Sequence, residues 1–343
     1  MKLTLKIKLI PSKEQACIID DTMKEYISLV NDVVEYVIAQ AAVPKLTSAS
    51  VKAKLPSVVK NQCIQDARSI YARAFRNNKK ISVLKKPVAI WNNQNYEVGG
   101  NYIAMPFFIN GKSKKIRIPA IVPEKIFECI NSHKLGAMRI TKKNEKYIAQ
   151  IAYEEIEMRS SGKNIMGIDL GIKCPAVAVI SDGTTKFYGN GRKNKYIRRY
   201  YATRRKTLNK AKKLNVIKNM QNKEQRWMND QDHKISRAIV NDAIAHNVGI
   251  IKMEKLSGIR QSARKSRKNN CNIHNWSFYR LMQYIEYKAA LAGIIVEYID
   301  PAYTSQTCPR CGKRNHANDR TYQCCCGYTA HRDRVGAVNI LVA

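Results

Sequence analysis

The chain has 343 residues, and its 61 Lys and Arg against 26 Asp and Glu leave a formal net charge of +35. This length allows two or three compact domains, and the charge exceeds what solubility requires, which predicts a polyanionic partner. No apolar run approaches the roughly 18 residues of a membrane-spanning helix and no signal peptide is evident, so we expect a cytoplasmic protein that binds nucleic acid and no membrane.

The first part of the chain combines a strand pattern with helical patterns. Residues 2–9 alternate polar and apolar side chains, which predicts a strand, and Ser12 with Gln15 forms a helix start signal. Apolar residues then recur with helical spacing over residues 19–37 and 64–75. Two helical regions are therefore expected after the first strand.

Short strand-like runs separated by turn signals fill residues 81–157. The runs are residues 88–91, 102–105, 115–118, 137–140 and 147–153. This pattern favours an antiparallel barrel or sheet, and we expect residues 1–11 to complete it. The helices would then form an insertion within a β domain.

A polar segment over residues 159–163 precedes a strongly apolar strand, so we expect a domain boundary there. The first predicted unit is a β domain of residues 1–11 and 81–158, interrupted by a helical domain of residues 12–80. A linker of residues 159–164 leads to a second predicted unit, residues 165–343.

Asp169 is the carboxylate in the apolar run of residues 165–172. An ionised group there is costly unless it is paired or bound to a cation. Strand-like runs follow at residues 176–180 and 185–188, and three antiparallel strands that begin with an acid are typical of a ribonuclease-H-like fold. Alone, this element is also compatible with the phosphate-binding turn of sugar kinases and actin-like ATPases, or with a buried structural aspartate.

Two further acids follow later in the chain. Glu254 ends the strand-like run of residues 249–254, and sites in α/β sheets assemble at such strand ends. Asp333 lies near the start of a terminal helical pattern, where an ordinary solvated acid is the alternative. With Asp169, these carboxylates could converge on two Mg²⁺ ions and hydrolyse a phosphodiester, one metal activating water and the other stabilising the leaving oxygen.

The ten cysteines divide into one cluster and five scattered residues, which we interpret as a metal site and ordinary buried thiols. The scattered residues are Cys17, Cys63, Cys129, Cys174 and Cys271. Two close pairs separated by a polar loop predict a zinc ribbon over residues 304–329, and we expect one structural Zn²⁺ there. The preferred ligands are Cys308, Cys311, Cys324 and Cys326. Pairings through Cys325 stay open, and His316 and His331 are second choices.

A strongly basic segment lies between the first and second acids. Residues 192–226 contain fourteen Lys or Arg and a single acid, Glu224, and a second cluster of five basic residues spans 260–268. A solvated charged helix usually balances its signs, so this imbalance favours contacts with phosphates. The candidate nucleic-acid contacts are Arg198, Arg199, Arg204, Arg205, Lys206, Arg264 and Lys265.

The order of these features resembles the RuvC-like nuclease of the transposon-encoded TnpB family, from which the miniature type V CRISPR nucleases descend. The matching motifs are Gly167-Ile-Asp-Leu-Gly171, Ile251-Lys-Met-Glu-Lys-Leu256, Tyr303 to Gly312 and Asp333 to Ile340, with the helical run from Trp276 to Ala289. The resemblance covers the C-terminal half closely and the first 160 residues more loosely. Two departures are Val335, where many relatives carry Asn, and the compressed second cysteine pair.

The resemblance implies a mixed α+β and α/β fold of several domains. A β-barrel wedge domain with an inserted helical recognition domain would precede a ribonuclease-H-like RuvC domain that carries the zinc ribbon, and the recognition helices would be reduced because the chain is short. It also implies a guide RNA, and a double-stranded DNA target with a short adjacent motif that the protein reads. Asp169, Glu254 and Asp333 match the family's catalytic acids.

Other functions remain compatible with the same residues. A nuclease-inactive, RNA-guided DNA-binding repressor would keep the fold without cutting, and a DNA strand-transfer transposase would use the same fold to join strands. A kinase-like ATPase is disfavoured by the zinc ribbon and the net charge. The acids predict Mg²⁺-dependent hydrolysis of a phosphodiester, and the resemblance implies that the protein is an RNA-guided DNA endonuclease.

Overall fold

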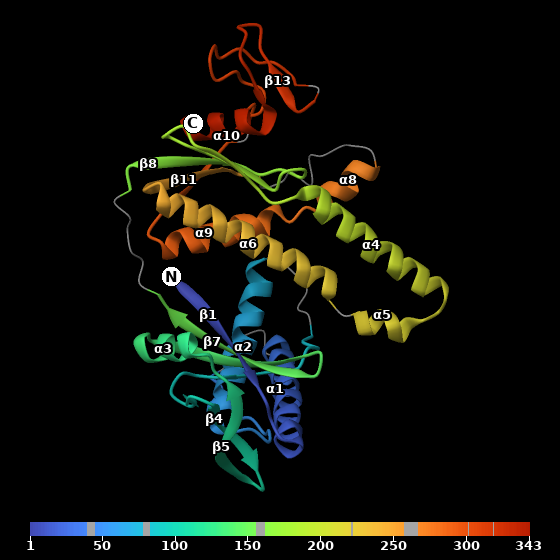
Figure 1. The fold of residues 1–343 in the computed structure, drawn as a ribbon. Coiled ribbons are helices and arrows are strands. Elements are labelled where there is room, and N and C mark those ends of the chain that lie inside the picture. The colour runs from blue at the N-terminus through green and yellow to red at the C-terminus, as the bar shows by residue number, and fades with distance from the viewer. Residues whose placement is uncertain are drawn as a thin grey trace. The chain divides into compact units, whose positions relative to one another are not determined.

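The computed structural model describes residues 1–39, 45–77, 83–155, 162–220, 222–256, 267–300, 302–317 and 319–343. The chain divides into two compact units, Met1–Ile156 and Glu157–Ala343, and each is described by itself (Figure 1). Across these described ranges, no helix is both long and apolar enough to cross a membrane.

The first unit is built on a seven-stranded sheet in the order β2-β6-β7-β1-β5-β4-β3. Its strands are β1 (Lys2–Leu9), β2 (Val88–Trp91), β3 (Glu97–Val98), β4 (Tyr102–Ile109), β5 (Lys112–Ile121), β6 (Leu135–Lys143) and β7 (Lys146–Glu154). All recorded pairings are antiparallel, and β1 lies between β7 and β5, so the predicted completion of the sheet by the first residues is confirmed. Asn110 and Gly111 both have positive φ in the tight turn between β4 and β5.

Two helices interrupt this sheet in sequence, α1 (Lys13–Ala39) and α2 (Ser57–Arg76), and a third, α3 (Glu124–Ser132), follows β5. The predicted start signal of α1 is present as reciprocal hydrogen bonds: Ser12 N donates to Gln15 Oε1 (3.1 Å), and Gln15 N donates to Ser12 Oγ (3.2 Å). The apolar faces of α1 and α2 share one hydrophobic core with the sheet, in which Met23, Tyr26 and Trp91 are fully buried. A separate helical domain of residues 12–80 thus stays a prediction.

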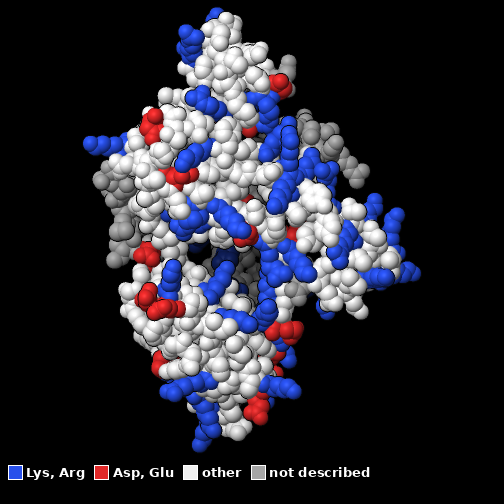
Figure 2. Space-filling model, in the orientation of Figure 1, with Lys and Arg blue, Asp and Glu red and all other residues white. Residues whose placement is uncertain are grey.

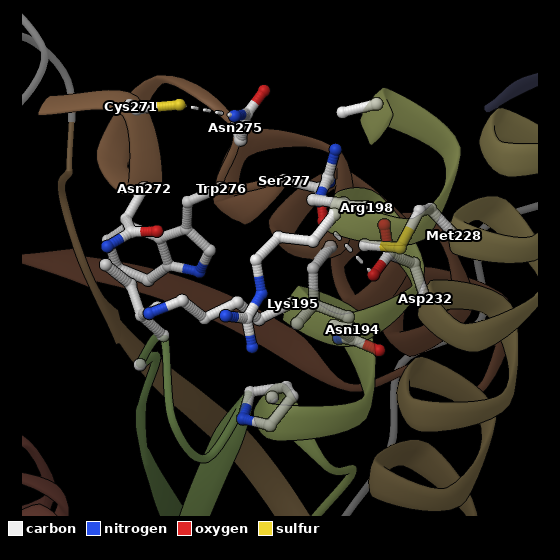
Figure 3. Close-up of a pocket in the computed structure, with 17 residues that line it drawn as sticks. Asn194, Lys195, Arg198, Met228, Asp232, Cys271, Asn272, Asn275, Trp276 and Ser277 are labelled. Carbon is white, nitrogen blue, oxygen red and sulfur yellow. Dashed lines mark hydrogen bonds between the residues drawn. The ribbon is translucent and has the colours of Figure 1, made fainter. Parts of the chain in front are cut away.

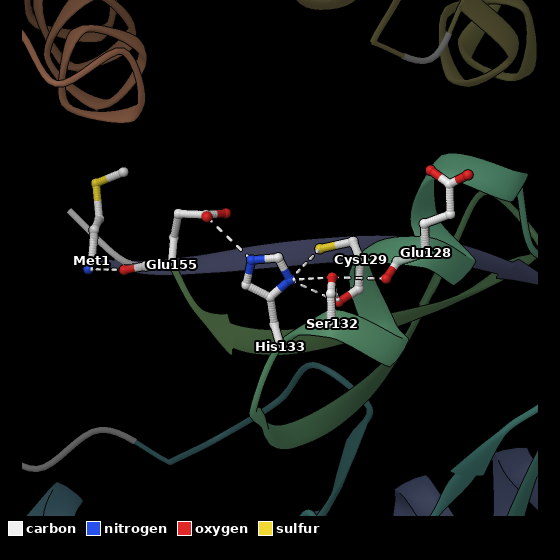
Figure 4. A network of polar contacts seen from close by, with 6 residues as sticks. All are labelled: Met1, Glu128, Cys129, Ser132, His133 and Glu155. Atoms are coloured by element: carbon white, nitrogen blue, oxygen red, sulfur yellow. Dashed lines mark hydrogen bonds and ion pairs between the residues drawn. The ribbon is translucent and has the colours of Figure 1, made fainter. Parts of the chain in front are cut away.

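A polar network at the C-terminal end of α3 joins that helix to the residue after β7 (Figure 4). His133 Nδ1 lies 2.8 Å from Ser132 Oγ and 2.9 Å from the carbonyl oxygen of Cys129, while Nε2 lies 3.1 Å from Glu155 Oε1. The Cys129 carbonyl and then the Glu155 carboxylate raise the pKa of His133. The imidazole is thereby favoured in its charged form.

The second unit is built on a five-stranded sheet in the order β10-β9-β8-β11-β12. Its strands are β8 (Asn164–Asp169), β9 (Ala176–Ile180), β10 (Thr185–Tyr188), β11 (Val248–Glu254) and β12 (Ile295–Ile299). β8, β9 and β10 pair antiparallel, as the sequence predicts, whereas β8, β11 and β12 run parallel. The mixed sheet is what brings the ends of β8 and β11 to one edge.

Helices cover both faces of the second sheet (Figure 1). The described part of this unit contains the helices α4 (Gly191–Lys210), α5 (Leu214–Met220), α6 (Lys223–Ala245), α8 (Arg267–His274), α9 (Phe278–Leu291) and α10 (Arg332–Val342), of which α6, α9 and α10 pack on the sheet. One core joins the sheet to α6 and α9, and a second, in which Val177 and Val179 contact Ala337, joins the opposite face to α10. A small hairpin, β13 (Thr321–Gln323) and β14 (Thr329–His331), leads into α10.

Candidate metal centres and basic surface

Two of the predicted acids lie at the carboxyl ends of neighbouring parallel strands. Asp169 is the last residue of β8, and Glu254 is the last residue of β11. In the parallel register Ile168 is opposite Met253, so each acid is the next residue on its strand. The strand ends therefore present both carboxylates at the same edge of the sheet.

The third acid reaches this edge because two glycines let β8 and α10 touch. A Cβ on Gly167 would lie 2.4 Å from the carbonyl oxygen of Ala337, and a Cβ on Gly336 would lie 2.9 Å from Asp169 Oδ2. Side chains three positions apart share one helix face, so Asp333 and Gly336 are on the same side of α10. The helix that carries Asp333 thus lies directly beside Asp169.

The three carboxylates interact electrostatically. Burial raises the pKa of Asp169 to about 8, with further contributions from the negative charges of Glu254 and Asp333, against which Arg332 and Arg320 act. Burial also raises the pKa of Glu254. Like charges held close together in a partly buried site disfavour ionisation unless a cation is present. The three predicted acids are brought together, whereas their catalytic role stays a prediction.

Sequence reasoning missed two residues that hold these acids. Thr304 donates a hydrogen bond through Oγ1 to Glu254 Oε1, and Arg320 Nη1 lies 2.6 Å from Asp333 Oδ1. Thr304 belongs to the motif from Tyr303 to Gly312 that carries part of the family resemblance, but the sequence assigns it no role of its own. No local pattern distinguishes Arg320 from the other basic residues of the chain.

Four of the five clustered cysteines converge. The Sγ atoms of Cys308, Cys311, Cys324 and Cys326 all lie within 4.8 Å of one another, with 3.7 Å between Cys308 and Cys326 and 3.5 Å between Cys311 and Cys324. Cys325 is exposed and outside this group. These are the four ligands that the sequence favours. Four thiolates at this separation suit a tetrahedral Zn²⁺.

The remaining candidates for this centre have other positions. His331 is the N-cap of α10, where its Nδ1 accepts a hydrogen bond from Asp333 N, and His316 is exposed. Among the scattered cysteines, Cys63 is buried and Cys129 and Cys174 are half-buried, whereas Cys17 and Cys271 are exposed, so the interpretation of all five as buried thiols is wrong for the last two. Cys17 lies on α1 and Cys271 on α8.

The basic segment forms α4, α5 and the start of α6, and Figure 2 shows Lys and Arg side chains gathered over α4 and α5. Arg199, Arg204 and Lys206 are exposed on α4. Arg198 is half-buried, its pKa is lowered by burial, and it lies 3.9 Å from Glu224, which also pairs with Arg205 at 2.7 Å. The candidates Arg264 and Lys265 lie outside the described residues.

The chain is similar to several known proteins. Residues 278–340 match the model of the Cas12f1-like TNB domain. The chain is 29% identical over 304 residues to a CRISPR-associated endodeoxyribonuclease Cas12f1 of Sulfoacidibacillus thermotolerans, covering 78% of this chain and 69% of that protein. It is 36% identical over 140 residues to a TnpB-like protein of Methanocaldococcus jannaschii, covering 40% of this chain and half of that protein.

A putative RNA-guided DNA endonuclease of Escherichia coli, InsQ, is 29% identical over 201 residues, which is 52% of this chain and 49% of that protein. Among solved structures, a Cas12f1 complex with guide RNA and target DNA superposes with a TM-score of 0.73 at 16% identity, covering 96% of this chain and 83% of that chain. At that identity the superposition shows a shared mixed α/β fold.

Proposed function

Since the chain belongs to the TnpB family, we propose that it is an endonuclease that cuts DNA at sites selected by a guide RNA. The observation that carries the proposal is the convergence of Asp169, Glu254 and Asp333 at one edge of the second sheet, beside a basic helix. The named activity of the relatives supports the same reaction.

We propose that the first unit contains the wedge and recognition domains that the family resemblance implies, and that the second unit contains the RuvC domain. In the proposed architecture, residues 1–11 and 81–158 form the wedge domain and residues 12–80 the recognition helices. Residues 165–343 form a ribonuclease-H-like RuvC domain with the zinc ribbon at residues 304–329. The antiparallel β8-β9-β10 order, followed by the parallel β11, supports the ribonuclease-H-like assignment.

The carboxylate group fits hard divalent cations. Its donors are oxygens, which such cations prefer. Burial and the two neighbouring acids raise the pKa of Asp169 to about 8, and a bound cation would offset this unfavourable ionisation. Asp169, Glu254 and Asp333 would hold two Mg²⁺ ions, which supply an activated water and stabilise the leaving oxygen of a phosphodiester. Thr304 fixes the orientation of Glu254, and Arg320 that of Asp333. Asp169 would release its proton if a cation bound there.

The proposed partners are a guide RNA and double-stranded target DNA with a short adjacent motif. The net charge of +35 and the exposed cations of α4 support phosphate contacts with both. Base pairing to the guide would supply the sequence information, while the protein recognises the shape of the duplex. A transposon origin and a cytoplasmic location belong to the same proposal.

The test is purification of the protein with its copurifying RNA, followed by sequencing of that RNA and a Mg²⁺-dependent cleavage assay on matched plasmid targets. We expect one discrete RNA with a variable end, cleavage by the wild type and none by Asp169→Asn. Glu297→Gln, which removes an exposed acid on β12, is the matched control and should cut normally. Target binding without any cleavage by the wild type would favour the inactive repressor, and joined DNA molecules among the products would favour the transposase.

A further inference from the structure

A cavity of about 550 Å³ lies in the second unit among α4, α6, α8 and α9 (Figure 3). Its apolar lining comes from Ile172, Pro175, Ala202, Met228, Trp276 and Leu281. This volume is in the range of sites that enclose a small organic group. Figure 3 shows Trp276 and Asn272 on one side and Met228 and Asp232 on the other, with Lys195 and Arg198 between them.

The cavity combines this apolar lining with positive charge. Lys195, Arg198 and Arg199 line it from α4. Asp232, the acid among the lining residues, is buried, and its Oδ2 lies 2.5 Å from Arg280 Nη2, so its charge is compensated. An aromatic indole beside several cations suits a ligand with a flat ring and an anionic group better than a purely apolar one.

A smaller recess of about 250 Å³ adjoins the cavity, because Arg198 and Met228 line both. Arg198, Arg205 and Arg280 converge on this recess, with Glu224 as the acid that faces them. Arginine is the side chain best suited to bind a phosphate through two parallel hydrogen bonds. An indole-lined cavity and an arginine-lined recess therefore lie side by side and share one arginine.

The cavity lining begins close in the chain to one of the three acids, although none of the three lines it. Gly171 and Ile172, which line it, follow Asp169 by two and three residues. A Cβ on Gly191 would lie 2.0 Å from the carbonyl oxygen of Ile172, so the start of α4 packs directly on this turn. A group held in the cavity would thus contact the turn that follows the strand of Asp169.

We propose that the cavity receives the base of one unpaired nucleotide of a bound nucleic-acid strand, stacked on Trp276, and that the arginine recess takes its phosphate. The base must be unpaired, because a base stacked within a duplex cannot enter a cavity. Stacking tolerates any sequence, since every base offers a π-face, which suits a protein whose specificity comes from a guide. This inference rests on the proposed function and adds a binding subsite to it.

The test compares two single-stranded probes of equal charge in the absence of Mg²⁺: a short oligothymidylate and the same backbone with abasic residues. Replacing Trp276 could disturb folding, since its ring packs on Phe278 with 5.1 Å between centroids. The better variant is Ala202→Phe, which fills the cavity from an exposed lining position on α4, and Thr203→Phe, exposed and outside the lining, is the matched control.

We expect the wild type and Thr203→Phe to bind the base-bearing probe roughly tenfold more tightly than the abasic probe. Ala202→Phe should lose this preference while keeping the affinity for the abasic probe, because the arginine recess is untouched. The same preference in all three proteins would overturn the assignment to this cavity. If free thymidine monophosphate competed with the probe at a concentration similar to that of the oligonucleotide, the cavity would be a site for a free nucleotide. That result would also overturn the proposal of a nucleotide held within a strand.

These measurements do not depend on cleavage. If the wild type fails to cut guided targets with Mg²⁺ yet shows the base preference and its loss in Ala202→Phe, the nuclease proposal fails and the subsite stands. If the wild type cuts but shows no preference for bases, the subsite fails and the nuclease proposal stands.

Discussion

Arg320 Nη1 lies 2.6 Å from Asp333 Oδ1 and 2.7 Å from Asp333 Oδ2. Arg320 comes immediately before β13, within the segment that carries the cysteine cluster, and Asp333 lies in the first turn of α10. The pair therefore connects the cysteine-bearing segment to the carboxylate group. The guanidinium of Arg320 therefore already occupies both carboxylate oxygens of Asp333 that a metal ion would need.

Arg320→Gln should lower the Mg²⁺ concentration required for half-maximal cleavage. The guanidinium competes for both oxygens of Asp333, and its removal destabilises the metal-free site relative to the metal-bound one. Arg310→Gln, which removes an equal charge from an exposed position, is the control for the general loss of positive charge. A higher Mg²⁺ requirement in Arg320→Gln alone would mean that Arg320 supports the metal-bound geometry.

Mg²⁺ should stabilise the protein more at about pH 8 than at about pH 6. The pKa of Asp169 in the folded protein is about 8, above its ordinary value of 3.8, so the folded state holds a proton that the unfolded state has lost. The stability contributed by that proton is complete below pH 3.8 and is lost as the pH rises through about 8. Cation binding replaces the proton and becomes easier over the same range.

The measurement is the thermal unfolding midpoint with and without Mg²⁺ across this pH range, for the wild type and Asp169→Asn. The neutral isostere should unfold at a higher temperature than the metal-free wild type at about pH 8 and should lose the Mg²⁺ effect. An Mg²⁺ effect that does not change with pH would contradict the role assigned to this carboxyl group.

Gly167→Ala should destabilise the protein by about 1–3 kcal/mol or more. The added Cβ would lie 2.4 Å from the carbonyl oxygen of Ala337 and 2.5 Å from the amide nitrogen of Leu341, and these backbone atoms of α10 cannot move independently of the helix. Urea unfolding measures the change. Gly100→Ala is the control, since its Cβ would meet no atom within 4 Å and its effect should be small.

Gly336→Ala should impair cleavage more than stability. Alanine favours a helix over glycine by roughly 1 kcal/mol, which offsets part of the steric cost. The new Cβ would lie 2.9 Å from Asp169 Oδ2, so the carboxylate must shift. Cleavage rates and unfolding free energies of the same preparation separate the two effects, and normal cleavage by a well-folded variant would contradict the close approach.

Cys311→Ser should lose the bound zinc, whereas Cys325→Ser should retain one ion per chain. The Sγ atom of Cys311 belongs to the converging group, and that of Cys325 does not. Zinc content by elemental analysis measures the first effect, and the unfolding midpoint measures the stability that the ion contributes. Zinc loss from Cys325→Ser with retention in Cys326→Ser would reverse the assignment of the second pair.

His133 should make the stability of the protein depend on pH. The Cys129 carbonyl and the Glu155 carboxylate raise its pKa above 6.5, so its contribution is complete below pH 6.5 and is lost as the pH rises through the folded-state value. The unfolding midpoint of the wild type minus that of His133→Asn should therefore fall over this range. His274→Asn, which removes an exposed histidine outside the network, should show no such trend.

Local features of this protein follow from its sequence because they depend on neighbours along the chain. The structure confirms the strands predicted at residues 2–9, 176–180 and 185–188. It also confirms the helix start signal of Ser12 and Gln15. Side chains in a strand repeat their direction every two residues, and side chains in a helix about every 3.6 residues, so both patterns can be seen in the sequence. The acids at the ends of β8 and β11 could be identified for the same reason.

Contacts between segments that are far apart in the chain produce no repeating pattern in the sequence. Only the tertiary structure decides which of these segments meet. It brings Gly167 against Ala337, pairs Arg320 with Asp333 and leaves Cys325 out of the group of four converging Sγ atoms. It also encloses the cavity beside Trp276, whose lining comes from segments between residues 171 and 281. The sequence by itself determined which residues could do chemistry, whereas packing decided which of them meet, because close approach depends on side-chain volume and backbone path across the whole unit.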